Sequence, residues 1–597
     1  MLQRPGKKSF DFPKSFSNMS SKRFYVDRKI IGIALMLIAL VPFILAVVGT
    51  LRHWVALPYW DEWFSPGTLL LSYAKGTLSF SDFFYQHNES RKAFPYLLYI
   101  TLAKIHGWDV RDGMVISLLE AAVICGLLFW LFIRTKGATA TTAVVALTLT
   151  SFLVFSPVQY DNFLSGLLFE LFIPGLATIL IALVNLSGLR FGIKTTINAV
   201  VALVATYTFA NGMLLWILGV PLPAAREPVS RRTRLLWYLI FALVGAAAIS
   251  AYFIDYKPPP SHPPFGFGIL QLAHYMILWV GGYFNSGPVS PFTVGIIVLS
   301  LWIVASANAI MLISRGVEWR RFYPWFLISV YALSSGLITA IGRVGFGVEQ
   351  ALSSRYAIFS LFIYLGLLGT TFAVYCYEQE GARPRRRQWI IGATIAVIAL
   401  AVPTWTSCFR AGQKSVVRIA RQNSGLLCAL EWMDVFPTNP DLKLILPYPN
   451  VLRTRAHVLA DAGLLRFHFV SPRFLNQLKG AGSSTDLSHG RLEPADVREN
   501  SLIASGWIWS STKGSDCVLI ALRKPTGQLE VLSVVTPVIA RPDVERQYGT
   551  EKMKAIGFWS RAPIPSLAEG VIEAWAVDTA AETASPLAGA QRVSFHP

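Results

Sequence analysis

The sequence predicts a mainly α-helical, polytopic membrane protein with about 11 transmembrane helices and a C-terminal domain outside the cytoplasm. The composition gives the first indication, because 53% of the 597 residues are hydrophobic and 15% are charged, whereas soluble proteins carry nearer a quarter charged residues. Apolar runs long enough to cross a bilayer recur between residues 30 and 407. Lysines and arginines gather in alternate loops between these runs, as the positive-inside rule requires.

The N-terminus reads as a basic cytoplasmic tail followed by a retained membrane anchor. Residues 1–29 contain eight Lys and Arg, and Ile30–Thr50 follows as 21 residues without a charge. That length is enough for one helical span. A signal peptide would have a shorter apolar core and a small-residue cleavage site, which are not seen here.

The remaining apolar runs define the membrane body, residues 30–407. Two short runs, 196–209 and 211–223, flank Asn211-Gly212 and are each too short for an upright span. They are compatible with two spans, a broken hairpin or one bent element. The runs that can span are 113–133, 138–156, 164–186, 235–254, 290–313, 322–341, 356–377 and 388–407.

The charge distribution predicts the orientation. With the N-terminus in the cytoplasm and the short runs counted as two spans, the cytoplasmic segments hold 23 Lys and Arg and the opposite loops hold 9. We therefore expect a bacterial inner-membrane protein whose C-terminal domain is extracytoplasmic. The net charge of +19 then mostly reflects the membrane topology, and we expect anionic lipids at the cytoplasmic face as partners. Nucleic-acid binding is excluded, because it would need a basic stripe on a soluble domain and the excess charge lies beside the membrane spans. The stretch 93–106 is read as an amphipathic helix at the outer interface.

The large first outer loop, residues 51–112, contains the candidate catalytic residues. Asp61 and Glu62 lie between Trp60 and Trp63 just beyond the first span. Carboxyl groups in such an interface can have raised pKa values, as a general base needs. The alternative is an aromatic belt with ordinary solvated acids.

A second polar group in this loop precedes the interfacial helix. His87, Asn88, Glu89 and Arg91 are candidates for contacts with sugar hydroxyls or phosphate. Alternatively, Asn88 caps the helix and Glu89 complements its dipole. His87 with Asp61 and Glu62 could also hold a divalent metal, but no ligand spacing supports it, and we expect no cofactor.

Two further outer loops add candidates for substrate binding. Gln159, Asp161 and Asn162 share one short turn, where they serve either turn chemistry or a site. Arg343 and Arg355 precede the span 356–377, and Arg355 beside exposed N–H groups is a candidate receptor for a lipid phosphate. The alternative is an interfacial arginine that snorkels to headgroups.

The C-terminal third divides into a connector, 408–490, and a β-sandwich-like domain, 491–597. The connector holds a helix-like stretch at 411–436 and a strand-like Lys443–Leu446. Among Cys408, Cys428 and Cys517 no zinc spacing occurs, and we do not expect a disulfide framework, at most one bridge. Alternating runs separated by turn signals indicate strands at Leu502–Trp509, Cys517–Arg523, Leu529–Val535 and Val571–Asp578.

A long acidic outer loop after the first span resembles the GT-C glycosyltransferase superfamily over residues 30–407. The segments Trp60-Asp61-Glu62-Trp63, Gln86-His87-Asn88-Glu89-x-Arg91, Gln159-Tyr160-Asp161-Asn162 and Ser354-Arg355-Tyr356 are also similar to a set of uncharacterised bacterial membrane proteins. The resemblance implies a polyprenyl-phosphate sugar donor and a carboxylate in the first outer loop that acts as the catalytic base or helps to hold the site. Asp61 and Glu62 resemble the Asp-Glu pair of the protein O-mannosyltransferase branch, although no D-x-D motif occurs.

We therefore predict a membrane glycosyltransferase of the cell envelope, active in polysaccharide biosynthesis. It would move a sugar from a polyprenyl-phosphate donor to a glycan, lipid or protein acceptor. Two alternatives remain open. One is a non-enzymatic component of surface-polysaccharide assembly or export, and the other is a lipid-sugar flippase.

Overall fold

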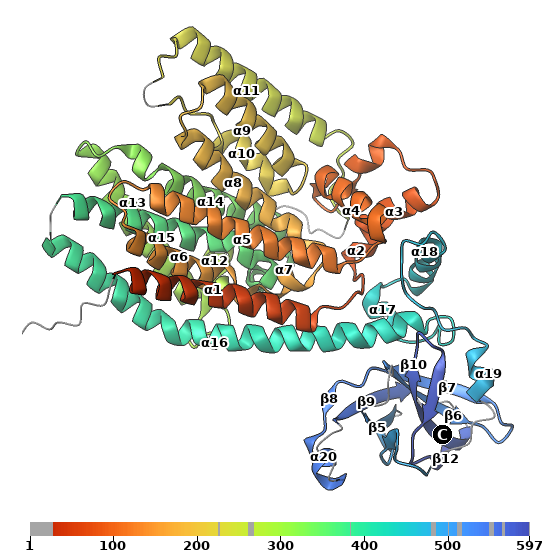
Figure 1. Cartoon of the computed structure of the whole chain (residues 1–597). Coiled ribbons are helices and arrows are strands. Elements are labelled where there is room, and N and C mark those ends of the chain that lie inside the picture. Colours follow the sequence, from red (N-terminus) through yellow and green to blue (C-terminus); the bar gives the residue numbers. More distant parts are fainter. Residues whose placement is uncertain are drawn as a thin grey trace, which may run out of the picture.

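The protein consists of a helical bundle and a C-terminal β-rich region (Figure 1). The computed structural model describes residues 28–224, 227–260, 268–381, 384–478, 485–498, 501–509, 516–548, 554–563 and 568–595. Among these residues, eight helical segments are long and apolar enough to cross a membrane: Ile30–His53, Arg111–Arg134, Ala140–Leu164, Leu168–Leu186, Arg231–Tyr252, Pro291–Ser314, Tyr323–Phe346 and Ser354–Glu380.

The eight segments coincide with eight of the expected spans, and the remaining three expected runs behave differently. The run 388–407 lies inside one 48-residue helix, α16 (Pro384–Glu431). The runs 196–209 and 211–223 form a helical hairpin with a short second arm. Because these three runs are not among the eight candidate spans, the total of 11 spans stays a prediction. The hairpin consists of α9 (Phe191–Thr206), the 3₁₀ turn η4 (Ala210–Leu214) and α10 (Leu215–Leu218).

The long helices of the bundle pack side by side around an apolar core. They are α1 (Arg28–His53), α5 (Arg111–Arg134), α6 (Ala140–Val154), α8 (Phe172–Leu186), α11 (Arg231–Tyr252), α13 (Pro291–Ser314), α14 (Tyr323–Arg343) and α15 (Ala357–Glu380). Short elements complete it: η2 (Pro157–Gln159), α7 (Tyr160–Leu164), η3 (Leu168–Leu171), α12 (Ile269–Gly281), η5 (Gly282–Phe284), η6 (Trp319–Arg321), η7 (Val344–Phe346), η8 (Val348–Leu352) and η9 (Ser354–Tyr356).

Glycine permits a close helix contact within the bundle. At Gly369 on α15, an added Cβ would clash with the indole ring of Trp325 on α14. Trp325 is fully buried there and stacks on Phe132 of α5, with ring centroids 4.8 Å apart. Small residues allow helices to approach in this way where a larger side chain would separate them.

The first loop folds into short elements at one end of the bundle, here called the loop end. They are α2 (Asp61–Phe64), α3 (Pro66–Ala74), η1 (Phe80–Phe84), β1 (Gln86–His87), β2 (Ser90–Arg91) and α4 (Ala93–His106). The expected helix at 93–106 is confirmed as α4. Strands β1 and β2 pair antiparallel, and Asn88 in their turn has φ 51°, which asparagine tolerates better than most residues. Asn88 therefore does not cap α4, whose N-cap is Lys92.

The connector packs on the first loop through α16, α17 (Leu442–Ile445) and α18 (Pro449–Asp461), whereas its last helix, α19 (Phe474–Leu478), packs against the β domain. The strand expected at Lys443–Leu446 is wrong, because α17 is a helical turn that buries Leu442 and Ile445, three residues apart on one face. The backbone N–H of Trp60 donates to the carbonyl of Ile445 at 3.0 Å. Leu57, Trp63, Leu430 and Leu459, among others, share one buried core.

The C-terminal β domain contains two five-stranded sheets that face each other across a shared core. One sheet has the order β11-β10-β6-β7 with β12 paired to β10, and the other has the order β3-β5-β9-β8 with β4 paired to β5. The strands predicted at Cys517–Arg523 and Leu529–Val535 are confirmed as β6 and β7. The remaining elements are β3 (Gly490–Leu492), β4 (Asp496–Arg498), β5 (Ser501–Trp509), β8 (Ile539–Ala540), α20 (Pro542–Tyr548), β9 (Ala555–Pro563), β10 (Ala568–Asp578), β11 (Thr583–Pro586) and β12 (Gln591–Phe595).

A disulfide joins the connector to the β domain. Cys428 near the end of α16 is bonded to Cys517, the first residue of β6, across 89 residues of sequence. We did not expect this bridge, because the two cysteines show no motif spacing and only the fold brings them together. The cross-link fixes the end of α16 against the sandwich. The three other cysteines, Cys125, Cys376 and Cys408, are free and buried.

Candidate functional site

Two groups of charged side chains lie at the loop end of the bundle. The acidic cluster comprises Asp61, Glu62, His87, Lys92 and Glu170. The arginine cluster comprises Asp161, Arg343, Arg355 and Arg418. The β1–β2 hairpin links the two groups, because His87 on it faces Asp61 and Glu89 in its turn pairs with Arg343.

Glu62 is a buried anchor of the acidic cluster. Its Oε2 accepts a hydrogen bond from the backbone N–H of Tyr59 at 2.8 Å, and its Oε1 accepts one from the Ser165 hydroxyl at 3.2 Å. The backbone N–H groups of Gly166 and Leu167 lie near enough to favour the ionised form of the carboxyl group. Burial nevertheless raises the pKa of Glu62 to about 7, because these donors offset only part of the lost solvation. Glu62 thus ties α2 to the 165–167 turn.

Asp61 faces the opposite way and remains accessible. Its side chain is 43% exposed, and its Oδ1 lies 3.8 Å from Nε2 of His87. The preceding residue, Trp60, has φ 48°, an uncommon backbone conformation for a large side chain that the surrounding structure must stabilise. The bond from its N–H to Ile445 and the anchoring of Glu62 provide that stabilisation.

His87 is buried and neutral. Burial, with the nearby positive charge of Lys92, lowers its pKa to about 2, so its ring carries no charge at physiological pH. Its Nδ1 has no hydrogen-bond partner among the described residues. A neutral imidazole can therefore donate or accept a hydrogen bond toward a substrate beside Asp61.

Lys92 and Glu170 form a buried ion pair that the sequence analysis did not assign to the site. Nζ of Lys92 lies 2.5 Å from Oε1 of Glu170, and both side chains are less than 5% exposed. Glu170 is close enough to Asp61 for their charges to interact. The only indication in the sequence was that Glu170 is a carboxyl residue inside an apolar run, which is rare. Its pairing with Lys92 could not be predicted from sequence spacing, because the two residues lie 78 positions apart.

Arg355 provides accessible positive charge at the start of α15. Its guanidinium is exposed, contacts the Ser353 hydroxyl at 3.3 Å and lies 5.6 Å from the ring centre of Tyr356. Arg355 and Arg418 of α16 both lie within electrostatic range of Asp161. No carboxylate lies within ion-pair distance of Arg355 in the part of the chain that the structure describes, so its charge is available to an anion.

Several predicted binding residues have structural partners. The Arg91 guanidinium donates to the carbonyl oxygens of Phe84, Tyr252 and Ile254 and holds the hairpin against α11. Gln159 is buried and donates to the Val154 carbonyl at 2.7 Å.

The other predicted binding residues differ in access to solvent. Asn162 is buried beside Gln159, to whose side-chain oxygen it donates at 3.4 Å, whereas Asn88 is exposed. The structure thus brings Asp61, His87, Glu89 and Arg343 together around the hairpin and places Gln159 and Asn162 in the bundle interior.

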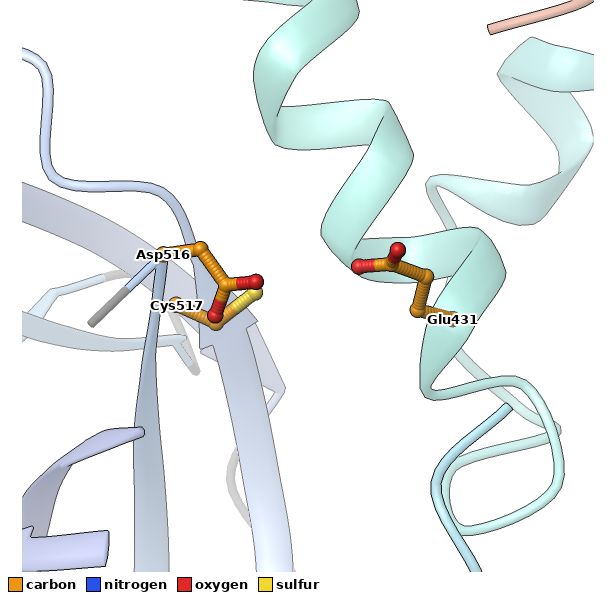
Figure 2. Close-up of side chains that lie close together, drawn as sticks. All are labelled: Glu431, Asp516 and Cys517. Atoms are coloured by element: carbon orange, nitrogen blue, oxygen red, sulfur yellow. The ribbon is translucent and has the colours of Figure 1, made fainter. Parts of the chain in front are cut away.

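A trio of potential metal ligands lies elsewhere, at the junction of the connector and the β domain. Within the described ranges, Glu431, Asp516 and Cys517 have ligand atoms within 4.8 Å of one another, and Figure 2 shows Glu431 on α16 facing the other two. The Cys517 sulfur is bonded to Cys428, however, and is not a thiolate. Burial and the charge of Asp516 raise the pKa of Glu431 to about 8, so the two carboxyls do not both need to be ionised at neutral pH. His87, Asp61 and Glu62 do not form such a trio.

Comparison of the chain with protein-family models, with curated protein sequences and with solved structures gave no match. The function is therefore inferred from the chemistry of the two clusters.

Proposed function

We propose that this chain is a membrane glycosyltransferase of the GT-C type. It would transfer a sugar from a polyprenyl-phosphate donor to a glycan, lipid or protein acceptor. One observation carries the proposal: Asp61, an accessible carboxylate fixed by the buried Glu62, shares the loop end with the exposed guanidinium of Arg355. A base and an anion receptor are the two groups that this reaction needs.

Two independent features support the proposed orientation. The asymmetry of Lys and Arg favours a loop end outside the cytoplasm. The Cys428–Cys517 disulfide favours an oxidising compartment for the β domain, such as the bacterial periplasm. Both support the same side of the inner membrane, where an extracytoplasmic acceptor would be available.

In the proposed reaction Asp61 accepts the proton of an acceptor hydroxyl. The hydroxyl oxygen forms a bond to C1 of the sugar while the bond between C1 and the lipid phosphate oxygen breaks. The electron pair stays on the phosphate, whose growing negative charge the Arg355 guanidinium stabilises. Attack opposite the leaving group inverts the configuration at C1. Neutral His87 orients the acceptor, and Glu62 positions Asp61.

A glycan-binding component of an assembly complex is the second candidate. Trp559 on β9 is 53% exposed, which is unusual for such a large aromatic side chain. Its flat face could stack on a sugar ring, as interface tryptophans do with partly apolar ligands. In that case the β domain would bind glycan and the loop carboxylates would be structural. The flippase alternative has less support, because Lys92 already neutralises Glu170.

The test is surface-glycan composition in a deletion strain that expresses wild-type, Asp61→Asn, Glu62→Gln or Asp82→Asn protein. Asp82 belongs to the same loop and accepts a bond from the Ser79 N–H at 2.8 Å, which asparagine can also accept. We expect wild-type and Asp82→Asn to restore the missing sugar, Asp61→Asn to fail, and Glu62→Gln to restore it in part. Full rescue by a well-expressed Asp61→Asn protein would exclude the transferase mechanism and favour the assembly component.

A further inference from the structure

A large cavity lies at the end of the bundle opposite the first loop, here called the basic end. Its volume is about 1390 Å³, which exceeds the range of about 300–1,000 Å³ that is typical of small-molecule sites. The ends of α5, α8, α14 and α15 and the segments around residues 135, 187, 224 and 318 surround it. None of these residues belongs to the acidic or arginine cluster.

The cavity has an apolar wall and a charged mouth. Leu127, Trp130 and Leu131 of α5 and Leu183 and Leu186 of α8 contribute the apolar part. From Gly126 to Arg134 this wall extends for about 12 Å along α5. The mouth carries five Lys or Arg and three Glu, an excess of two positive charges. A ligand that fits both parts is amphipathic and anionic.

Arg321 supplies a specific binding group in this cavity. Its side chain is only 7% exposed, and one terminal nitrogen donates to Oε1 of Glu380 at 2.9 Å. The other, Nη1, is buried without a hydrogen-bond partner within the described residues. A buried guanidinium N–H that lacks an acceptor costs free energy, which a bound anion would recover.

The neighbouring charges leave this position positive. Glu380 is shared between Arg321 and Lys136, whose Nζ lies 3.7 Å away. Arg134 lies 4.6 Å from the ring centre of Trp130 and has no carboxylate partner in the described chain. Arg321 and Arg134 line the same cavity, so both can attract an anion that binds there.

We propose that this cavity binds a lipid through its phosphate group. The phosphate would accept hydrogen bonds from Nη1 of Arg321 and from Arg134, and the first part of the hydrocarbon chain would lie along α5 and α8. Arginine suits such a site because its planar guanidinium matches phosphate oxygens. The shared chemistry fits a bilayer phospholipid or a polyprenyl phosphate. The proposal does not depend on the transferase mechanism at the loop end.

The test is native mass spectrometry of delipidated, purified full-length protein titrated separately with four probes: phosphatidylglycerol, polyprenyl phosphate, diacylglycerol and inorganic phosphate. We expect phosphatidylglycerol, polyprenyl phosphate or both to bind, and the lipid that binds more tightly identifies the source of the phosphate. Diacylglycerol should bind at least about tenfold more weakly, because it lacks the phosphate that accepts charge-assisted hydrogen bonds. Diacylglycerol binding as tightly would overturn the proposal. Tight binding of inorganic phosphate alone would also overturn it, because the apolar wall would then have no role.

Three variants localise the binding. Arg321→Gln and Arg134→Gln should each weaken lipid binding by about tenfold, the effect of losing one charge-assisted hydrogen bond. Arg232→Gln, an exposed arginine at the same end that does not line the cavity, should bind like wild-type. Arg134→Gln leaves the Arg321–Glu380 pair intact and decides the question if Arg321→Gln does not fold. Equal binding by Arg134→Gln and Arg232→Gln would overturn the proposal.

Discussion

Asp61 and Glu62 are adjacent in sequence, yet their carboxyl groups lie in different surroundings. Asp61 is accessible beside His87, whereas Glu62 is 4% exposed and accepts bonds from the 165–167 turn. Sequence alone left open which of the two would act as the base. The structure distinguishes an accessible carboxyl group from a buried one that is fixed by hydrogen bonds. The following two predictions concern single residues.

The buried carboxyl of Glu62 should make stability depend on pH. Its pKa is raised from 4.5 to about 7 in the folded protein, so the folded state binds this proton more tightly than the unfolded state. The stabilisation is complete below pH 4.5 and is lost as pH rises through about 7. Between these limits the free energy of unfolding should fall by roughly 3 kcal/mol more in wild-type than in Glu62→Gln. Thermal unfolding in detergent at pH 5 and pH 8 measures this, with Asp82→Asn as control. An unchanged pH dependence in Glu62→Gln would contradict the assignment.

Arg355 should affect turnover but not stability. In the proposed mechanism, Arg355→Gln removes the charge that would stabilise the leaving phosphate, and removal of one such group typically lowers kcat by about a hundredfold or more. The side chain is exposed, so unfolding should be unchanged. Transfer from a polyprenyl-phosphate sugar to acceptor, followed by chromatography of labelled product, gives kcat and KM. The exposed Arg410 on α16 is a matched control. If Arg355→Gln and Arg410→Gln are equally active, Arg355 has no role in catalysis.

At the scale of elements, the contact between α14 and α15 depends on Gly369. A methyl group there would clash with Trp325, so Gly369→Ala should destabilise the protein by about 1–3 kcal/mol through overpacking. Gly342→Ala, on α14, has no atom within 4 Å of the new Cβ and should be neutral or slightly stabilising. Midpoints of thermal unfolding for the two variants test this. A Gly369→Ala protein as stable as Gly342→Ala would show that the two helices are not packed so closely.

The sequence predicts elements well where one local pattern decides them. Strands β6 and β7 were predicted to the residue, because turn signals bound both runs. The apolar runs likewise located the long helices. A run of four residues is too short to distinguish the two-residue repeat of apolar side chains in a strand from the 3.6-residue repeat in a helix, so the segment Lys443–Leu446 was predicted as a strand. In the structure, this segment packs on the first loop as a helical turn.

The candidate site was only partly predictable, because its contacts join distant parts of the chain. The loop carboxylates and Arg355 were identified from local context, and their roles stay predictions. The Lys92–Glu170 pair, Arg418 near Asp161 and the Cys428–Cys517 bridge depend on residues that lie 78 to 257 positions apart. A single sequence contains no periodicity at that range.

At the scale of the whole molecule, the disulfide provides a test of orientation. If the β domain is extracytoplasmic, Cys428 and Cys517 should be joined in cells, because that compartment is oxidising. Both sulfurs are buried, so the thiols are counted by maleimide labelling of acid-trapped, denatured protein, with and without prior reduction. We expect reduction to add two labels to the wild-type protein and none to a Cys428→Ser/Cys517→Ser protein, whose other three cysteines are free. Five labels on the wild-type protein without reduction would place the domain in the cytoplasm.

The shared core of the first loop and the connector has a consequence for biogenesis. Trp63 and Tyr96 are buried together with Ile445 and Leu452, yet more than 330 residues separate α4 from α17. At about 5–20 residues per second, the ribosome needs roughly 20–70 s to synthesise that stretch. During this time the nascent first loop exposes apolar surface that has no partner. The loop end can therefore fold completely only after the connector has been made and has reached the same side of the membrane.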